Sequence, residues 1–341
     1  MDPADGRALT PERKAAIPDP LDASLIICTR NRADRLRRAL DSACAMEPPR
    51  AARWELVVVD NGSADATAAT VAAFAGRLPI RYVAEPEPGL SIARNRGIKE
   101  ARGRYICWTD DDVRLDRGWL AAYLDAFRRH PDAALFGGPI IPELEPPARP
   151  LFQRCKDHPP LSGVFAKRDF GSRILPLGFE GGVLPWGANF AVRSEEQRHH
   201  PYNPALGTAP GRDRLGEEID MIYRLLKAGA SGWWVPDARA MHMIGCERQR
   251  LAYVFAYYRR WGETLGYLQH RLPGDNAVDA VDPPRIARMG ALALGARLLW
   301  GAAGAAAALI TARPCECLLH LADFATTLGM IHYRRAVRHE G

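Results

Sequence analysis

The chain has 341 residues, of which 47% are hydrophobic and 25% charged, values that exclude a small disulfide scaffold, a wholly disordered chain and a polytopic membrane protein. Its net charge of +6 comes almost entirely from arginine, because the sequence contains only five lysines. Arginine favours bidentate contacts with phosphate, so this charge suits nucleic acid, an anionic membrane surface or a phosphorylated substrate.

The cysteines are odd in number and form no CxxC pair, although they are spread along the whole chain at positions 28, 44, 107, 155, 246, 315 and 317. Paired CxxC spacings are the usual mark of a zinc site in an intracellular chain. We therefore expect neither a structural zinc site nor a disulfide framework, and a reducing cytosol as the compartment.

The first twenty residues contain four prolines and no apolar run, which predicts a flexible tail rather than a signal peptide. From Ala23 onwards, short β-rich runs alternate with helical stretches, which predicts a mainly parallel sheet flanked by helices. Helices are predicted over 33–45 and over 65–75, the second with Ser63 as its N-cap. The predicted strands cover 24–28, 55–60, 80–85, 104–110 and 133–138.

Residues 139–185 are rich in proline and glycine and show little periodicity, which predicts a long loop over a ligand site. Helical spacing returns over 216–228 and 248–269. In parallel sheets of this kind, ligands bind beyond the carboxyl ends of the strands.

The C-terminal third has a different composition. Residues 290–311 carry one charge, Arg297, and are long enough to span a bilayer, but their alanine and glycine content makes insertion close to neutral in free energy. Residues 318–338 have the spacing of a basic amphipathic helix. Two interpretations stay open, attachment to a membrane surface or a helix pair packed on the domain. The predicted division is a tail (1–20), a catalytic α/β domain (21–245) and a helical region (246–341).

Three carboxylates, Asp110, Asp111 and Asp112, follow the predicted strand 104–110. Acids held this close either raise one another's pKa or bind a hard cation such as Mg²⁺, Mn²⁺ or Ca²⁺. The structural alternative is an acidic loop or a helix cap before Trp119.

Asp60 ends another strand and would lie at the same edge of the sheet. The sequence has no GxGxxG, no GxxxxGK[ST] and no GxSxG, which argues against dehydrogenases, P-loop NTPases and serine hydrolases. The acids could bind a ribose and a metal, and the arginines at 94 and 96 could bind phosphate, so together they indicate a nucleoside diphosphate as the ligand.

A further acidic group, Glu217, Glu218 and Asp220, begins the helix predicted over 216–228. Acids at a helix N-terminus complement the helix dipole, but a general base would look the same. His242 follows an apolar run, where a lone histidine is more often a packed residue than a ligand.

The order of these motifs resembles the family-2 glycosyltransferases of the GT-A fold. The resemblance spans roughly residues 23–245. The matching segments are SLIICTRNRADRL (24–36), ELVVVDNGSADAT (55–67), GLSIARNRGIKEARGRYICWTDDDV (89–113), PWGANFAVR (185–193), GEEIDMIYRLLKAGA (216–230) and VPDARAMH (235–242).

The resemblance implies a role for each matching residue. The nucleotide site would contain Thr29, Asp60, Arg94, Asp110 and Asp111, with Asp110 towards the ribose. Mn²⁺ or Mg²⁺ would be held by Asp112 and His242. The acceptor and donor-sugar pocket would contain Gly187, Ala188, Asn189 and Glu217. The catalytic base would be Glu218, with Asp220 in reserve.

The chain departs from the family pattern at two points. The base is usually an aspartate, whereas this sequence reads Glu217-Glu218, and a glutamate can transfer the same proton with a longer reach. The QxxRW signature of processive members is missing, since Tyr257 stands at its first position before Arg260-Trp261. Transfer of one sugar per encounter is therefore expected.

The expected activity is inverting, metal-dependent transfer of a sugar from a nucleotide-diphosphate sugar to a hydroxyl of a glycan or lipid-linked acceptor, in the cytoplasm or at the inner membrane face. A non-catalytic nucleotide-sugar-binding or assembly protein is the alternative. A sugar-phosphate nucleotidyltransferase would need a glycine-rich phosphate loop after the first strand, which CTRNRADRL lacks. No recognised nucleic-acid-binding module is found, so nucleic acid is not expected as a partner.

Overall fold

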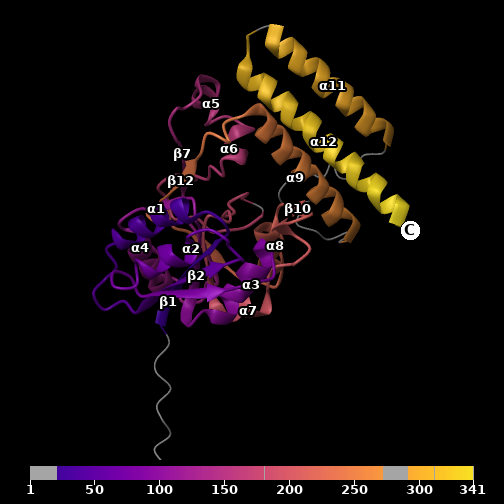
Figure 1. Cartoon of the computed structure of the whole chain (residues 1–341). Helices are drawn as coiled ribbons and strands as arrows, with labels where there is room; N and C mark the ends of the chain where they lie inside the picture. Colours follow the sequence, from indigo (N-terminus) through magenta and orange to yellow (C-terminus); the bar gives the residue numbers. More distant parts are fainter. Residues whose placement is uncertain (1–20, 180, 272–290, 311, 341) are drawn as a thin grey trace, which may run out of the picture.

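The computed structural model describes residues 21–179, 181–271, 291–310 and 312–340, so the predicted tail over 1–20 lies outside the described residues. Its centre is a seven-stranded sheet with the order β11-β6-β8-β4-β1-β2-β3 (Figure 1). All neighbouring strands in it are parallel except those that pair with β8, so the predicted parallel sheet is confirmed with one reversed strand. The strands are β1 (Leu21–Thr29), β2 (Trp54–Asp60), β3 (Ile80–Ala84), β4 (Gly103–Asp110), β6 (Leu135–Gly137), β8 (Asn189–Arg193) and β11 (Gly232–Trp234).

Helices cover both faces of this sheet. Successive residues of β1 point to opposite faces, and Leu25, Ile26 and Ile27 are all buried, as expected for a parallel strand between two helical layers. One face packs against α1 (Ala33–Cys44), α2 (Thr67–Ala72) and α4 (Trp119–Arg129). The other packs against α3 (Leu90–Glu100) and α8 (Glu217–Lys227), with α7 (Ser194–His199) beside α3.

A second sheet of three strands stands beyond the carboxyl ends of the main strands. It contains β5 (Val113–Leu115), β12 (Ala240–Ile244) and β7 (Ile140–Leu144), with β12 in the centre. A hairpin of β9 (Gly207–Ala209) and β10 (Arg212–Arg214) lies beside α3 and α9. These additions enclose the edge of the main sheet where its strands end.

Two local predictions need correction. The segment 139–185 is not a single loop, because it contains β7, α5 (Pro150–Cys155) and α6 (Leu161–Val164). The helix predicted over 65–75 is limited to α2. At its start the carboxylate of Asp65, rather than the side chain of Ser63, accepts a hydrogen bond from the backbone N–H of Thr67. Ser63 instead accepts a hydrogen bond from the backbone N–H of Asn31.

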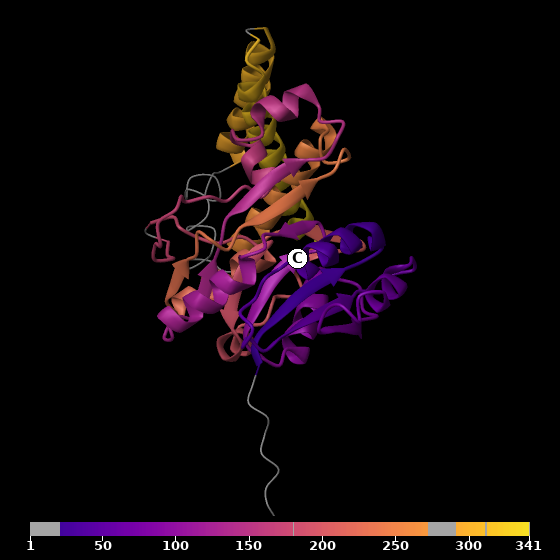
Figure 2. The same ribbon diagram turned by 90° about the vertical axis from the view of Figure 1, so that its left-hand side faces the viewer.

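The C-terminal helices pack together beside the α/β part. α12 (Pro314–Glu340) lies between α9 (Leu251–Arg271) and α11 (Ala291–Ile310), as Figure 1 shows. Figure 2 shows the yellow C-terminal helices standing above the α/β part. Arg297, the single charge in α11, pairs with Asp323 of α12. α11 and α12 thus pack against each other as a helix pair, and attachment to a membrane surface stays a prediction. Within the described ranges, no helix combines the length and apolar content that a membrane crossing requires.

A disulfide joins Cys155 of α5 to Cys315 of α12, which corrects the expectation that the cysteines form no disulfide. The two residues are 160 positions apart, so no local spacing in the sequence indicates the pairing. They meet because α5, α6, β12, α9 and the start of α12 share a small apolar core that includes Phe152, Phe165 and Leu318.

Candidate active site

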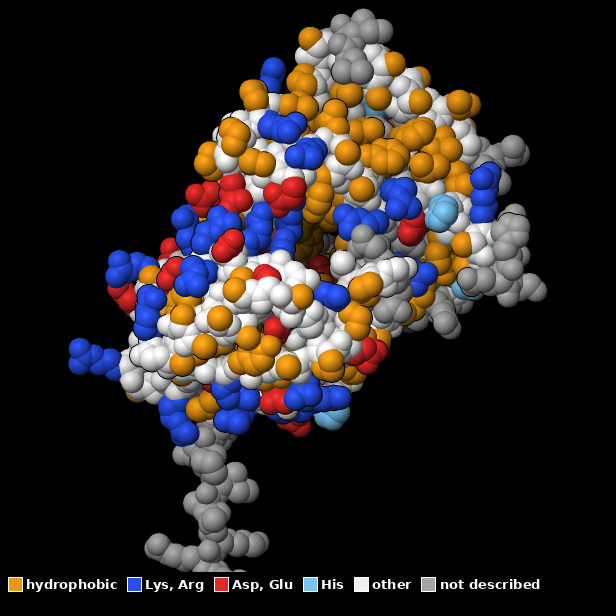
Figure 3. All heavy atoms as spheres, in the orientation of Figure 1, with side chains coloured by type: hydrophobic (Ala, Val, Ile, Leu, Met, Phe, Trp, Pro, Cys, Tyr) orange, Lys and Arg blue, Asp and Glu red, His pale blue; other side chains and the backbone are white. Residues whose placement is uncertain are grey.

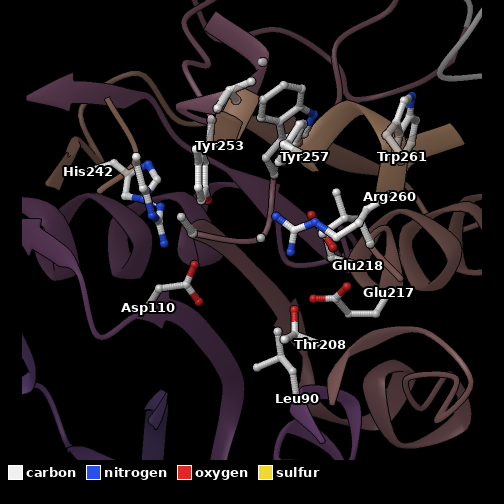
Figure 4. Close-up of a pocket in the computed structure, with 18 of the residues that line it drawn as sticks. Leu90, Asp110, Thr208, Glu217, Glu218, His242, Tyr253, Tyr257, Arg260 and Trp261 are labelled. Atoms are coloured by element: carbon white, nitrogen blue, oxygen red, sulfur yellow. Dashed lines mark hydrogen bonds between the residues drawn. The ribbon is translucent and has the colours of Figure 1, made fainter. Parts of the chain in front are cut away.

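A cavity of about 1170 Å³ opens where the main sheet ends and the C-terminal helices begin. Figure 3 shows it as a hollow between the α/β part and the helices, with arginine and lysine side chains along part of its rim. Its floor includes Thr29 and Asp110 at the strand ends, and α9 contributes Tyr253, Tyr257 and Trp261 to its wall. In Figure 4 the side chains of Tyr253 and Tyr257 point into the cavity on the side opposite Asp110.

Strand register brings the predicted acids to this edge. Thr29 pairs with Asp60 between β1 and β2, and Cys28 pairs with Asp110 between β1 and β4. Asp111 and Asp112 follow in the turn that leads to β5. His242 stands opposite Val113 in the antiparallel β5–β12 pair, which places it beside Asp112 although 130 positions separate them in the sequence.

Asp111 is held by two groups from the end of β1 and the turn after it. The Thr29 hydroxyl donates to its Oδ2 over 2.8 Å, and the Arg32 guanidinium contacts its Oδ1 over 2.5 Å. Burial raises the pKa of Asp111 to about 6, although Arg32 opposes the shift. The Asp111 side chain is 4% exposed, so it acts in this structure as a buried partner that fixes Thr29 and Arg32.

Asp112 and His242 form a buried pair with Arg248 from the segment between β12 and α9. Nη2 of Arg248 donates to Oδ2 of Asp112 over 2.8 Å, and its Nη1 donates to Nε2 of His242 over 2.8 Å. Oδ1 of Asp112 lies 3.5 Å from Nε2 of His242. Burial alone would raise the pKa of Asp112, but the guanidinium cations of Arg248 and Arg32 beside it hold that pKa well below its ordinary value.

The donor chemistry of this pair fits a divalent cation. His242 Nδ1 lies 2.7 Å from the carbonyl oxygen of Phe165, an acceptor only, so Nδ1 carries the proton and Nε2 keeps the lone pair that a metal needs. Across the described residues, no group of three or more His, Cys, Asp or Glu side chains is arranged to hold a metal. Two protein ligands are nevertheless a usual number for Mg²⁺ when substrate phosphates supply the rest.

A second buried ion pair lies across the cavity. Nη1 of Arg94, on α3, contacts Oε1 of Glu217 over 2.6 Å, and its Nη2 lies 3.4 Å from Oδ1 of Asp110. Arg94 and Glu217 are buried, whereas the Asp110 side chain is 36% exposed. Asp110 is therefore the member of the acidic triplet that is open to a ligand.

Glu218 follows Glu217 at the start of α8, and its side chain lines the cavity. Burial, with the neighbouring Glu217 next in importance, raises the pKa of Glu218 to about 7 despite Arg94. A side chain at Gly187 would place its Cβ 3.3 Å from Oε1 of Glu218 and 3.3 Å from Nη2 of Arg94. The glycine thus leaves the Glu218 carboxylate room to face the cavity.

Three predicted site residues have other surroundings. Asn189 is fully buried; its amide donates to the carbonyl oxygens of Pro139 and Ala238, so it does not line the cavity with Gly187 and Ala188. Asp220 pairs with Arg224, one turn along α8.

Asp60 accepts from the Tyr82 hydroxyl and from the Ser63 backbone N–H, and it likewise lies outside the cavity lining.

Sequence reasoning missed two residues that shape the site, Arg32 and Arg248. Arg32 lies within a segment that matches the family, but nothing in its local pattern indicates that it turns back to Asp111. Arg248 lies beyond the matching segments, in an irregular stretch before α9. Only the pairing of β12 with β5 brings that stretch to the acids, so the missing signal is a tertiary one.

Comparison with known proteins agrees with the motifs. A family model described as Glycosyl transferase family 2 matches residues 24–193. The chain is 31% identical over 246 residues to the succinoglycan biosynthesis protein ExoM of Rhizobium meliloti, covering 71% of this chain and 73% of that protein. It is 28% identical over 233 residues to the pre-mycofactocin glycosyltransferase of Mycobacterium tuberculosis, covering 66% of this chain and 43% of that protein.

Solved structures show the same fold at low sequence identity. The mannosyltransferase PcManGT of Pyrobaculum calidifontis, in complex with GDP-Man and Mn²⁺, superposes with a TM-score of 0.60 at 17% identity, covering 92% of this chain and 87% of that one. Residues 1–349 of S. aureus TarS in complex with UDP give a TM-score of 0.52 at 14% identity, covering 94% and 92%. The chain therefore belongs to glycosyl transferase family 2, and it is a glycosyltransferase with the GT-A fold.

Proposed function

We propose that this glycosyltransferase moves a sugar from a nucleotide-diphosphate sugar to an acceptor hydroxyl with inversion at the anomeric carbon. The observation that carries the proposal is the Glu218 carboxyl, which lines the cavity and has a pKa of about 7. A general base works best when its pKa is close to the operating pH. Glu218 would accept the acceptor proton as the new glycosidic bond forms.

The donor would lie at the strand ends. Thr29 and Asp110 line the floor of the cavity there, and arginines at 30, 32, 94 and 248 line the same space. Guanidinium groups bind phosphate oxygens bidentately, so this surface suits a diphosphate. Asp112 and His242 would hold Mn²⁺ or Mg²⁺. When bound, the ion supplies Lewis-acid stabilisation of the negative charge that develops on the leaving diphosphate.

The acceptor would enter from the side of α9. Tyr253, Tyr257 and Trp261 present aromatic surface there, and such rings commonly stack on sugar rings or apolar chains. The similarity to ExoM, a succinoglycan biosynthesis protein, supports a role in polysaccharide synthesis with a glycan or lipid-linked acceptor. The missing QxxRW signature supports addition of a single sugar at each encounter.

The experiment measures sugar release from UDP-, GDP-, dTDP- and CDP-sugars, with and without Mn²⁺, for the wild type and for Glu218→Gln. Glutamine keeps the shape of the side chain but cannot accept the proton. We expect one donor class to be used and turnover by Glu218→Gln to fall roughly 10²- to 10⁴-fold, the usual contribution of a general base.

The matched control is Glu195→Gln, which removes an exposed carboxylate from α7 and should leave turnover unchanged. Asp220→Asn distinguishes the reserve base from Glu218. If Asp220→Asn abolished turnover while Glu218→Gln did not, the assignment of the base would be wrong. If the wild type used no nucleotide sugar, the proposed reaction itself would be wrong.

We also propose that α11 binds the inner face of the cell membrane, as part of a cytoplasmic enzyme that reaches lipid-linked acceptors. Leu299 and Trp300 of α11 are 75% and 61% exposed, and Leu319 of α12 is 48% exposed. Sedimentation with vesicles containing phosphatidylglycerol tests this. Leu299→Ser with Trp300→Ser should reduce the bound fraction severalfold, because both lost side chains contribute apolar area. Equal binding of the double variant and the wild type would contradict it.

A further inference from the structure

Arg248 lies where Asp112 and His242 would otherwise share a cation. Its guanidinium bridges the two, with one nitrogen 2.8 Å from His242 Nε2 and the other 2.8 Å from Asp112 Oδ2. The side chains of Arg248, Asp112 and His242 are 18%, 2% and 6% exposed. A buried carboxylate requires a counter-charge, and Arg248 supplies it here together with Arg32, which lies 3.3 Å from Oδ2 of Asp112.

The Arg248 contact and a metal ion exclude each other at His242. Because Nδ1 donates to the Phe165 carbonyl, Nε2 has the only lone pair of the ring, and that lone pair accepts from Arg248. A lone pair that accepts an N–H cannot coordinate a metal at the same time. Arginine stays protonated at every ordinary pH, so it must move away before another cation can bind.

We propose that Arg248 competes with the divalent metal for Asp112 and His242, and that a diphosphate entering the cavity frees these ligands by drawing Arg248 away. This inference rests on the proposed function, in which the donor carries a diphosphate. Arg248 lines the same cavity as Thr29 and Asp110, so a diphosphate bound there lies within the space its guanidinium faces.

The segment that carries Arg248 runs over residues 245–250, between β12 and α9, and belongs to neither element. Its guanidinium can therefore exchange one set of anionic oxygens for another without a change in the sheet. The metal and the diphosphate then bind cooperatively, and each raises the affinity of the other by the same factor. In the absence of a diphosphate, the guanidinium of Arg248 occupies the position of the metal between Asp112 and His242.

The test measures Mn²⁺ binding to the full chain by electron paramagnetic resonance, with and without inorganic pyrophosphate. Mn²⁺ bound by pyrophosphate itself is subtracted. Arg248→Met keeps an unbranched chain but removes the charge and the donors. We expect this variant to bind Mn²⁺ alone roughly 5- to 150-fold more tightly than the wild type, the usual range of coupling between sites. Pyrophosphate should raise the Mn²⁺ affinity of the wild type more than that of the variant.

Two controls locate the effect. Arg250→Met removes an exposed arginine from the same segment and should leave Mn²⁺ affinity unchanged. Adding His242→Ala to Arg248→Met should remove the gain in affinity, which places the ion at this pair. If Arg248→Met does not fold, Arg248→Lys serves instead, because it keeps the charge but cannot bridge both partners; its Mn²⁺ affinity should lie above that of the wild type.

Equal Mn²⁺ affinity of the wild type and a folded Arg248 variant would overturn the inference, and so would a gain that survives the loss of His242. Sugar transfer is measured separately. If the wild type turns over a donor but its Mn²⁺ affinity does not change when Arg248 is replaced, the proposed reaction stands and the competition is rejected. A competition observed without any donor turnover rejects the proposed reaction alone.

Discussion

Glu218 lies in surroundings that oppose its own ionisation. Burial removes water from the carboxyl, Glu217 adds a second negative charge beside it, and Arg94 compensates only in part, since it also pairs with Glu217. The resulting pKa of about 7 is far above the ordinary 4.5. A carboxyl with this pKa is half ionised near neutrality and largely ionised about one pH unit above it.

If Glu218 is the base, as we propose, the rate of sugar transfer should rise with pH through about 7, because a carboxyl accepts a proton only in its ionised form. The measurement is kcat/KM against pH with a fixed donor. We expect an ascending limb with an apparent pKa near 7 in the wild type, and no such limb in the residual activity of Glu218→Gln. An ascending limb near pH 4.5 would show that the base lies elsewhere.

The raised pKa of Glu218 also makes the stability of the folded protein depend on pH. A carboxyl whose pKa is raised in the folded state contributes stability that is complete below about pH 4.5 and is lost as pH rises through about 7. Glu218→Gln removes the charge that burial disfavours. Thermal unfolding should give the variant a higher Tm than the wild type at pH 8 and nearly the same Tm at pH 5. A lower Tm at both pH values would contradict this.

Residues at strand ends could be predicted from the sequence, because the register of a parallel sheet brings them to one edge. Asp110 and Thr29 followed from this rule, and the pattern around 216–220 placed Glu218 on a helix N-terminus. Arg248 could not be predicted, since its partners depend on a strand pairing between distant segments. Asn189 was assigned to the pocket by its motif, but the structure uses its amide to join two buried carbonyl groups.

Among the elements, the long periodic or apolar runs and the short strands β3 and β6 were predicted, whereas the short helices α5 and α6 were not. β1, β2 and β4 are buried on both faces and stand out as apolar runs, and α9 and α12 have sustained helical spacing. α5 and α6 are only 6 and 4 residues long and lie among prolines, so tertiary packing rather than local preference forms them. The reversed direction of β8 depends on its neighbours and has no local signal.

The packing of α12 on α9 depends on glycines that let the two backbones approach. A Cβ at Gly329 would lie within van der Waals overlap of the Arg259 carbonyl oxygen, and one at Gly262 would overlap that of Thr326. Gly329→Ala should therefore force the helices apart and lower the free energy of unfolding by about 1–3 kcal/mol, measured by denaturant titration.

Gly295→Ala in α11 is the matched control for this substitution, because a Cβ there meets nothing within 4 Å. It should stabilise the helix by about 0.5–1 kcal/mol, the ordinary preference for alanine over glycine. If both variants changed stability equally, the close approach of α9 and α12 would not depend on Gly329.

At the scale of the whole molecule, the C-terminal helices are part of the site. The cavity is lined by Thr29 from β1, by Tyr257 from α9 and by Thr326 from α12. The division between a catalytic domain over 21–245 and a helical region over 246–341 remains our proposal for how the chain is organised. The helices beyond 246 would then complete the cavity rather than merely flank it.

The disulfide between Cys155 and Cys315 ties the two parts together. A bond between residues 160 positions apart restricts the unfolded chain strongly, and such bonds typically contribute about 2–4 kcal/mol. Cys315→Ser should therefore lower Tm by several degrees under oxidising conditions. In the presence of a reductant, the wild type and the variant should unfold at the same temperature. A difference that persists after reduction would point to packing rather than to the bond.

Cys155 is the last residue of α5, and the segment that follows it contains α6 and reaches Phe165, whose carbonyl selects the tautomer of His242. The covalent bond thus fixes the far end of the segment that orients the imidazole, while its other end holds the first turn of α12. With the disulfide formed, the imidazole of His242 would be held more rigidly than with both cysteines reduced. The redox potential of the compartment would thereby affect the orientation of His242, although this effect requires no redox-active group in the cavity itself.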